Sequence, residues 1–292
     1  MSKINTPLKQ LNNGNNIPVI GLGTYLIKGH NASNLVYEAC LKGYRHFDTA
    51  VLYQNEKEVA AGIIRFIEEE SVKTGKSFDE IRKTFFYTTK LWNSQCDGSY
   101  EKVIRAIDGC IESVGKLKYI DLLLIHSPLM GPKHRLQTWK AMQDYGEDKL
   151  KNIGVSNFGA KHIQELLSWD GLKIKPVVNQ LEISPWLMRK ELTDMCIKNS
   201  IEVEAFSPLT HGENLNNPVI TQIAYKYEKT NAQILIKWSI QTGHIPLPKT
   251  GTVERLAGNL DVFDFELSRD DIKAISHPEA YQPTDWECTD CP

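Results

Sequence analysis

The segment Ile120-Asp121-Leu122-Leu123-Leu124-Ile125 is apolar at every position but one. A short apolar run of this kind is typical of a strand buried on both faces, and such strands belong to parallel sheets covered by helices. Seven other short segments have the composition of strands: 18–22, 45–48, 85–90, 151–155, 176–180, 202–206 and 245–247. The eight segments together predict one parallel sheet.

Helical patterns separate most of these strands. They cover residues 32–42, 56–69, 100–114, 134–145, 160–168, 188–199 and 231–241. Strands that alternate with helices over 292 residues favour an α/β fold in which one domain, residues 1–292, forms a (β/α)8 TIM barrel. A short C-terminal tail is expected to follow the barrel.

Two local motifs mark the edges of these elements. The pair Asn13-Gly14 lies between two short apolar segments and predicts an N-terminal β-hairpin ahead of the barrel. Asn55, followed three residues later by Glu58, resembles a capping box that would start the helix at 56–69.

An open, doubly wound sheet is the rival architecture, and it usually carries a glycine fingerprint for a dinucleotide. The nearest candidate, Gly21-Leu22-Gly23-Thr24-Tyr25, lacks the third glycine of that fingerprint and the helix that should follow it. The barrel is therefore the favoured fold. Two glycines still allow the backbone here to pass close to a ligand.

Composition narrows the class of protein. The formal net charge of −2 gives no electrostatic reason to expect binding to nucleic acid or to an anionic membrane. No apolar run is long enough to span a membrane, and residues 1–7 lack the apolar core of a signal peptide. We therefore expect a cytoplasmic protein.

The six cysteines are scattered along the chain, which at this chain length indicates reduced thiols and not a disulfide framework. Only Cys288 and Cys291 have ligand-like spacing. One such pair supplies half of a structural zinc site, so no metal site is expected.

Four reactive side chains follow predicted strands. Asp48 and Lys90 end two of the strands, Tyr53 lies just beyond Asp48, and His126 follows Ile125. Each has an ordinary explanation on its own: a turn cap, a solvated loop residue, an apolar edge or a hydrogen-bonded histidine. Because the catalytic groups of a barrel lie at the carboxyl ends of its strands, the four together predict an active site.

Several blocks of sequence, in their order and spacing, resemble the aldo-keto reductase superfamily. They are Phe47-Asp48-Thr49-Ala50, Tyr53-Gln54-Asn55-Glu56, Thr89-Lys90-Leu91-Trp92, Ile125-His126-Ser127-Pro128, Gly154-Val155-Ser156-Asn157-Phe158 and Val178-Asn179-Gln180. The resemblance runs from the predicted hairpin to residues 262–267 and is greatest to yeast and fungal reductases of aldehydes, aldoses and ketones. It implies an NADPH-dependent enzyme that reduces small carbonyl compounds and has no obligate protein partner.

The resemblance implies a catalytic tetrad of Asp48, Tyr53, Lys90 and His126. Carbonyl reduction needs a hydride at carbon and a proton at oxygen, and a nicotinamide cofactor supplies only the hydride. Tyr53 would supply the proton, because the ammonium of Lys90 favours the phenolate and so lowers the phenol pKa. Asp48 would hold Lys90 in a buried ion pair, and His126 would orient the carbonyl oxygen.

The resemblance also implies the cofactor positions. The nicotinamide end would be bound by Ser156, Asn157 and Gln180, with the aromatic ring of Phe206 stacked on it. The adenosine end would be bound by Lys249, Thr250, Arg255 and Asn259. Two cations and a hydroxyl among these residues suit the adenosine 2′-phosphate, which favours NADPH over NADH. The other cofactor positions are Gly23, Thr24, Ser207 and Leu209.

The substrate positions implied are aromatic: Tyr25, Trp92 and, on the tail, Trp286. An aromatic wall over a small polar centre suits aldehydes and moderately apolar ketones, and it leaves pentoses, aromatic aldehydes and diketones open as substrates.

Two other functions are compatible with parts of the sequence. A metal-dependent hydrolase could use His46, Asp48 and His126, although it needs three well-placed ligands and Lys90 would repel the metal. A non-catalytic, cofactor-sensing regulatory subunit would resemble the channel-associated members of the superfamily, because fold similarity is a weak guide to role.

Overall fold

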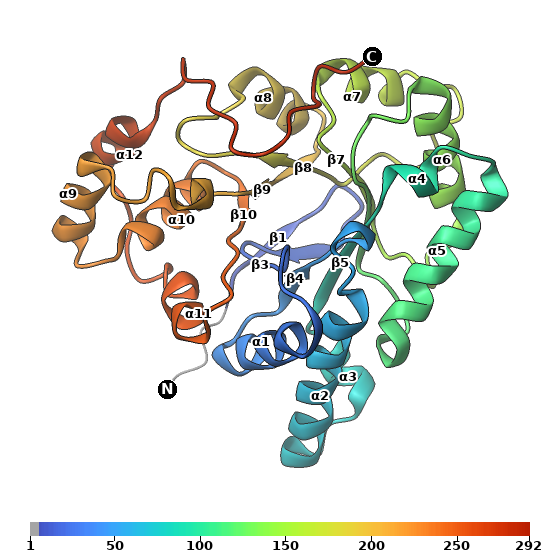
Figure 1. Cartoon of the computed structure of the whole chain (residues 1–292), viewed down its shortest axis with the longest axis horizontal. Coiled ribbons are helices and arrows are strands. Elements are labelled where there is room, and N and C mark those ends of the chain that lie inside the picture. Colours follow the sequence, from blue (N-terminus) through green and yellow to red (C-terminus); the bar gives the residue numbers. More distant parts are fainter. Residues whose placement is uncertain (1–5) are drawn as a thin grey trace.

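The computed structural model describes residues 6–292 and contains one sheet of eight parallel strands, surrounded by helices (Figure 1). The strands are β3 (Leu22–Gly23), β4 (His46–Asp48), β5 (Phe86–Leu91), β6 (Leu122–Ile125), β7 (Ile153–Ser156), β8 (Val178–Glu182), β9 (Glu202–Phe206) and β10 (Ile245–Leu247). They follow one another in chain order around the sheet. The predicted parallel sheet of eight strands is confirmed.

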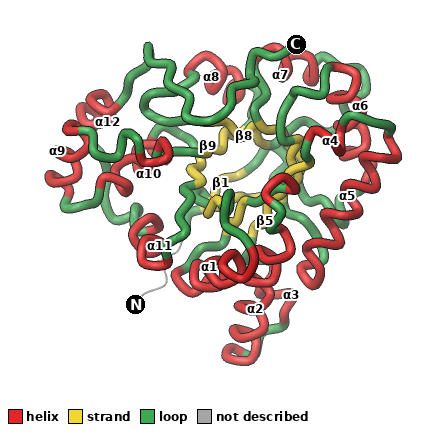
Figure 2. The backbone as a smooth tube through the Cα atoms, in the orientation of Figure 1, coloured by secondary structure: helices red, strands yellow, loops and turns green. Residues whose placement is uncertain are grey.

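Hydrogen bonds between the first and last strands close the sheet into a barrel. The amides of Gly21 and Gly23 donate to the carbonyl oxygens of Pro246 and Pro248, each over 3.1 Å. Figure 2 shows the resulting ring of strands inside a ring of helices. A side chain at Gly21 would place its Cβ 2.7 Å from a methyl group of Leu247, so the closure requires glycine there. The (β/α)8 barrel is therefore confirmed.

The hairpin ahead of the barrel is also confirmed. Strands β1 (Leu8–Gln10) and β2 (Asn16–Pro18) pair in antiparallel register, and Gly14 takes a φ of +88° in the turn. Ile17 and Leu11 are buried in a cluster with Leu122, Leu124 and other apolar side chains of the barrel interior. The hairpin thus closes the end of the barrel opposite to the reactive side chains.

The helices that the sequence predicts are present with small shifts at their ends. They are α1 (Gly29–Lys42), α2 (Glu56–Thr74), α5 (Tyr100–Val114), α6 (Pro132–Tyr145), α7 (Ala160–Leu167), α8 (Lys190–Lys198) and α10 (Asn231–Gln241). Five helices were not given bounds from the sequence: α3 (Phe78–Arg82), α4 (Asn93–Cys96), α9 (Pro218–Tyr227), α11 (Val253–Leu260) and α12 (Arg269–Ile275). No helix within residues 6–292 is long and apolar enough to cross a membrane.

Two local expectations are wrong. The first barrel strand is β3 and not 18–22, because Asn16–Pro18 is already paired in the hairpin. Asn55 precedes α2 but makes no side-chain cap. Its amide instead donates to the carbonyl oxygens of Thr24 and Ile27, over 2.9 and 2.7 Å, because these buried acceptors need a partner. Residues 1–5, part of the stretch in which no signal peptide is expected, lie outside the described residues.

Candidate active site

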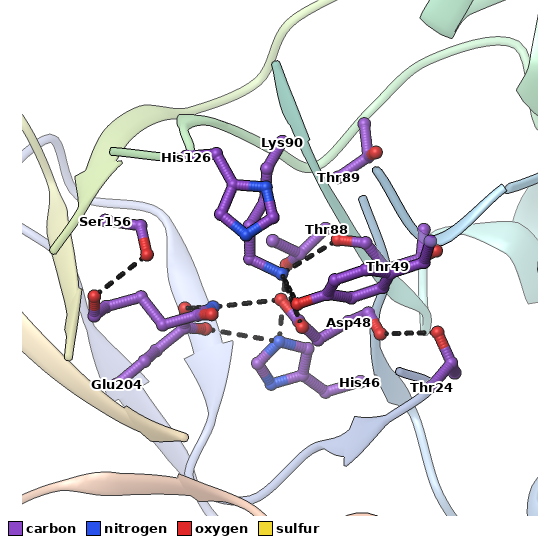
Figure 3. A network of polar contacts seen from close by, with 12 residues as sticks. Thr24, His46, Asp48, Thr49, Thr88, Thr89, Lys90, His126, Ser156 and Glu204 are labelled. Carbon is purple, nitrogen blue, oxygen red and sulfur yellow. Dashed lines mark hydrogen bonds and ion pairs between the residues drawn. The ribbon is translucent and has the colours of Figure 1, made fainter. Parts of the chain in front are cut away.

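The four reactive side chains meet at the carboxyl end of the barrel. Lys90 donates to Oδ1 of Asp48 over 2.6 Å, to the carbonyl oxygen of Thr49 over 2.9 Å and to the hydroxyl of Tyr53 over 3.3 Å. The ring of Tyr53, in the short 3-10 helix η1 (Val51–Tyr53), packs edge-on against the ring of His126 with centroids 5.7 Å apart. Figure 3 shows Asp48 and Thr49 beside the Lys90 ammonium, with the ring of His126 close by.

The barrel strands dictate this convergence. Side chains two apart on a strand point to the same face, so His46 and Asp48 on β4 both point inward, as do Thr88 and Lys90 on β5. Lys90 is wholly buried, where an unpaired ammonium would be costly. One carboxylate and two further oxygens accept hydrogen bonds from the ammonium, which lowers the cost of burying its charge.

The environment of Tyr53 keeps its hydroxyl protonated. Burial raises the pKa of Tyr53 to about 12, although the Lys90 ammonium acts in the opposite direction. The sequence predicts that the ammonium lowers this pKa; its effect has the predicted sign, but burial is the larger effect. At neutral pH the side chain is therefore a phenol with a proton to donate.

His126 is held neutral. Burial and the nearby Lys90 charge lower the pKa of His126 well below its ordinary value. Its Nδ1 is buried and has no hydrogen-bond partner within residues 6–292. A neutral imidazole can donate one hydrogen bond without adding a second positive charge beside Lys90.

A second buried carboxylate lies one layer deeper in the barrel, and the sequence analysis missed it. Gln180 on β8 donates through Nε2 to Oδ2 of Asp48 over 2.9 Å and to Oε2 of Glu204 over 2.8 Å. Oε1 of Glu204 lies 3.3 Å from Nε2 of His46, which also contacts the Thr88 hydroxyl (Figure 3). Glu204 occupies an inward position in the middle of β9. A glutamate inside a predicted buried strand is the sequence feature that could have indicated this second carboxylate.

These contacts fix the orientation of the Gln180 amide. Two carboxylates accept hydrogen bonds and cannot donate them when ionised, so they hold the NH₂ group of Gln180 toward themselves. Because Gln180 also lines the cavity above the tetrad, its side-chain oxygen Oε1 is the polar atom left for a ligand.

Ser156 and Asn157 tie neighbouring strands together at the same level. The Ser156 hydroxyl donates to the carbonyl oxygen of Gln180, and Nδ2 of Asn157 donates to the carbonyl oxygen of His126, each over 3.0 Å. Asn157 takes a φ of +60°, a conformation that asparagine tolerates better than most residues.

A cavity of about 370 Å³ opens above these groups. The predicted site residues that line it are Gly23, Tyr25, Asp48, Tyr53, His126, Ser156, Asn157, Gln180, Phe206, Ser207, Leu209, Lys249, Arg255 and Trp286. Other lining residues were not predicted from the sequence, among them Leu26, Leu52, His211, Leu215 and Asp285. Asp285 could have been predicted only from its position next to Trp286.

Five predicted site residues do not line this cavity. Lys90 lies beneath its floor, and the Thr24 hydroxyl is buried and donates to the carbonyl oxygen of Asp48 over 2.8 Å. The Thr250 hydroxyl accepts from the amide of Thr252, just before α11, and Asn259 is buried within that helix. Trp92 packs edge-on behind His126, with ring centroids 5.0 Å apart.

No group of three or more histidine, cysteine, aspartate or glutamate side chains between residues 6 and 292 is arranged to hold a metal ion. His46 faces Glu204, not His126, so the three ligands of the hydrolase alternative are not assembled. Cys288 and Cys291 are both free thiols.

Comparisons with known proteins agree with this fold. A sequence model described as the aldo/keto reductase family matches residues 19–278. An uncharacterized oxidoreductase of Saccharomyces cerevisiae is 54% identical over 284 residues, which cover 97% of this chain and 98% of the relative. Glyoxal reductase of Bacillus subtilis is 40% identical, with 91% and 90% of the two chains covered.

A solved structure gives the same result in three dimensions. The aldo-keto reductase of Bombyx mori, crystallised in complex with NADP, superposes with a TM-score of 0.81 at 35% identity, over 93% of this chain and 92% of that chain. The fold and the site define a barrel oxidoreductase. This chain belongs to the aldo/keto reductase family.

Proposed function

We propose that this protein is an NADPH-dependent reductase that converts small aldehydes, aldoses and ketones to alcohols, with Tyr53 as the proton donor. One observation carries the proposal: the hydroxyl of Tyr53 lies 3.3 Å from the buried Lys90 ammonium and faces a cavity. A phenol with a pKa of about 12 is protonated at neutral pH and can protonate an oxygen that gains negative charge.

The residues around the cavity fit the proposed cofactor. The side-chain oxygen Oε1 of Gln180 is free to accept a hydrogen bond from the carboxamide NH₂ of a nicotinamide. Phe206 offers an aromatic face in the same cavity. Lys249 and Arg255 bring two cations to the cavity, which suits the phosphates of NADPH. When bound, NADPH supplies the hydride that a carbonyl carbon must receive.

The chain's own residues would then manage the proton. Tyr53 gives its proton to the carbonyl oxygen while the carbonyl carbon receives the hydride, and the two transfers together give the alcohol. Lys90, paired with Asp48, stabilises the phenolate that this step leaves behind. The neutral His126 donates a hydrogen bond to the same oxygen and orients it.

Tyr25 and Trp286, which line the cavity, would form the substrate wall, and Trp92 would support it from behind. Trp286 packs against Trp92, with ring centroids 5.7 Å apart, and Tyr25 packs against the ring of Tyr53 over 5.0 Å. We also propose a cytoplasmic location, which the six free cysteines support. A small carbonyl compound is the proposed partner, with no nucleic acid, membrane or obligate protein partner.

The test follows loss of the absorbance of NADPH or NADH with xylose, arabinose, benzaldehyde, methylglyoxal and a 1,2-diketone, with and without chelator. Turnover with NADPH that survives the chelator, and that falls about 10²–10⁴-fold in Tyr53→Phe, is the expected result. Binding of NADPH without turnover of any substrate would favour the cofactor-sensing subunit. Activity that requires a metal would contradict the mechanism.

A further inference from the structure

The C-terminal tail is fixed to the barrel beside the cavity. Glu182, the last residue of β8, is 2% exposed, and its carboxylate lies against the tail. Its carboxylate accepts from the amide and hydroxyl of Thr284, over 2.7 and 2.5 Å, and from the amide of Asp285, over 3.3 Å. The backbone that carries Asp285 is therefore held in place, and Figure 1 shows the tail passing over this side of the barrel.

Asp285 lines the cavity together with the adjoining Trp286 and with Tyr53. Its Oδ1 accepts from the amide of Trp286 over 2.9 Å. Its Oδ2 lies 3.9 Å from Nε2 of His211, beyond hydrogen-bond length, and receives no hydrogen bond from any residue between 6 and 292. Burial is the main cause of the raised pKa of Tyr53, and the nearby charge of Asp285 acts in the same direction.

Among residues 6–292, no lysine or arginine lines the cavity beside Asp285. The other lining carboxylate, Asp48, is already paired with Lys90. Lys249 follows β10 and Arg255 is in α11, on the side of the barrel where β10 meets β3. Asp285 instead lies in the tail segment held by β8, and the adjoining Trp286 packs over His126 with ring centroids 6.5 Å apart.

His211 is the charged or titratable group that faces Asp285 most directly. It also contacts the hydroxyl of Ser207 through Nε2, over 3.0 Å, and its side chain is 45% exposed. An exposed imidazole at 3.9 Å weakens the field of a carboxylate only in part, because solvent screens the pair.

We propose that Asp285 makes this active site discriminate against anionic carbonyl substrates, such as those that carry a carboxylate or a phosphate, and in favour of neutral and cationic ones. This inference rests on the proposed reductase function and deepens it. A second negative charge brought beside a partly buried carboxylate is repelled, whereas a quaternary ammonium is attracted to it and to the adjacent aromatic rings.

The test uses three benzaldehydes that differ only in their para substituent: 4-carboxybenzaldehyde, 4-nitrobenzaldehyde and 4-(trimethylammonio)benzaldehyde. The ratio of kcat/KM for a charged aldehyde to that for the nitro compound is compared between wild type and Asp285→Asn at saturating NADPH. Intrinsic reactivity cancels in this comparison. We expect the ratio for the carboxylate to rise about tenfold in the variant and the ratio for the ammonium to fall by a similar factor.

Asp290→Asn is the matched control. It removes the same charge from the same tail, at an exposed residue that does not line the cavity, so it should leave both ratios unchanged. A second measurement needs no variant: added salt should raise the wild-type ratio for the carboxylate, because it screens the repulsion.

The inference is overturned if neither Asp285→Asn nor added salt changes the kcat/KM ratios by more than twofold. The proposed function survives that result as long as the nitro compound is reduced. A wild type that reduces none of the three aldehydes would overturn the proposed function, and with it this inference. The two failures are thus distinguishable.

Discussion

The ammonium of Lys90 lies 2.6 Å from a carboxylate oxygen of Asp48, and both side chains are buried in the barrel interior. Such a pair is held together by strong attraction in a medium of low polarity, but each charge depends on its partner because water cannot replace it. The pair connects β4 to β5 directly below the Tyr53 hydroxyl. Several consequences can be measured.

Asp48→Asn should destabilise the protein. The substitution leaves the Lys90 ammonium buried without a counter-charge, which costs about 3–5 kcal/mol of the free energy of unfolding. Urea titration followed by circular dichroism measures this loss. Asp194→Asn is the control, because Lys190 and Asp194 form an exposed pair whose loss should cost less than about 1 kcal/mol. Equal losses in the two variants would contradict the argument.

The pH dependence of reduction should reflect a protonated Tyr53. The acid is active while it keeps its proton, so kcat/KM stays level from neutral pH upward and falls only as the pH approaches the Tyr53 pKa of about 12. Because the pKa of His126 is well below its ordinary value, His126 stays neutral across this range and adds no decline. A pH profile of aldehyde reduction measures this, and a decline centred several units lower would show that burial does not dominate.

Glu204→Gln should weaken cofactor binding more than it slows the chemical step. The substitution removes one of the two negative charges that hold the Gln180 amide in a single orientation. We expect the Kd for NADPH, measured by fluorescence titration, to rise about tenfold, the effect of losing one charge-assisted hydrogen bond. Glu202→Gln is the control, because Glu202 begins the same strand and pairs with Lys9 far from the cavity. Equal NADPH affinity in wild type and Glu204→Gln would contradict this role.

Acid should release the tail. Burial acts to raise the pKa of Glu287, but hydrogen bonds from Thr289, Arg189 and Tyr281 outweigh it and lower the pKa to about 2. A group whose pKa is lower in the folded state stabilises the protein above its unfolded pKa, about 4.3, and loses that effect as the pH falls through the folded value.

The difference in free energy of unfolding between wild type and Glu287→Gln should therefore be largest near neutral pH and shrink between about pH 4 and pH 2. Denaturant titrations at several pH values measure it. A difference that is independent of pH would mean that the glutamate acts by shape alone.

Much of the fold could be predicted from the sequence, because the signals are local. A run such as 120–125 can be buried only between two layers, and Asn13-Gly14 suits a tight hairpin turn whatever lies around it. The alternation of strands and helices then leaves few topologies. Asn55 was misread because its buried amide bonds to Thr24 and Ile27, which lie far away along the chain.

The sequence by itself determined the barrel, the family and which residue types stand at the ends of the strands. Only the tertiary structure decided how these residues act on one another. Burial raises the pKa of Tyr53, and the contacts of Gln180 with Glu204 on β9 and with Asp48 on β4 set the orientation of its amide. The tail carries Asp285 into the cavity because Glu182, more than a hundred residues earlier in the chain, holds it there. These effects depend on distance and on solvent exclusion, which are properties of the folded chain and not of any segment.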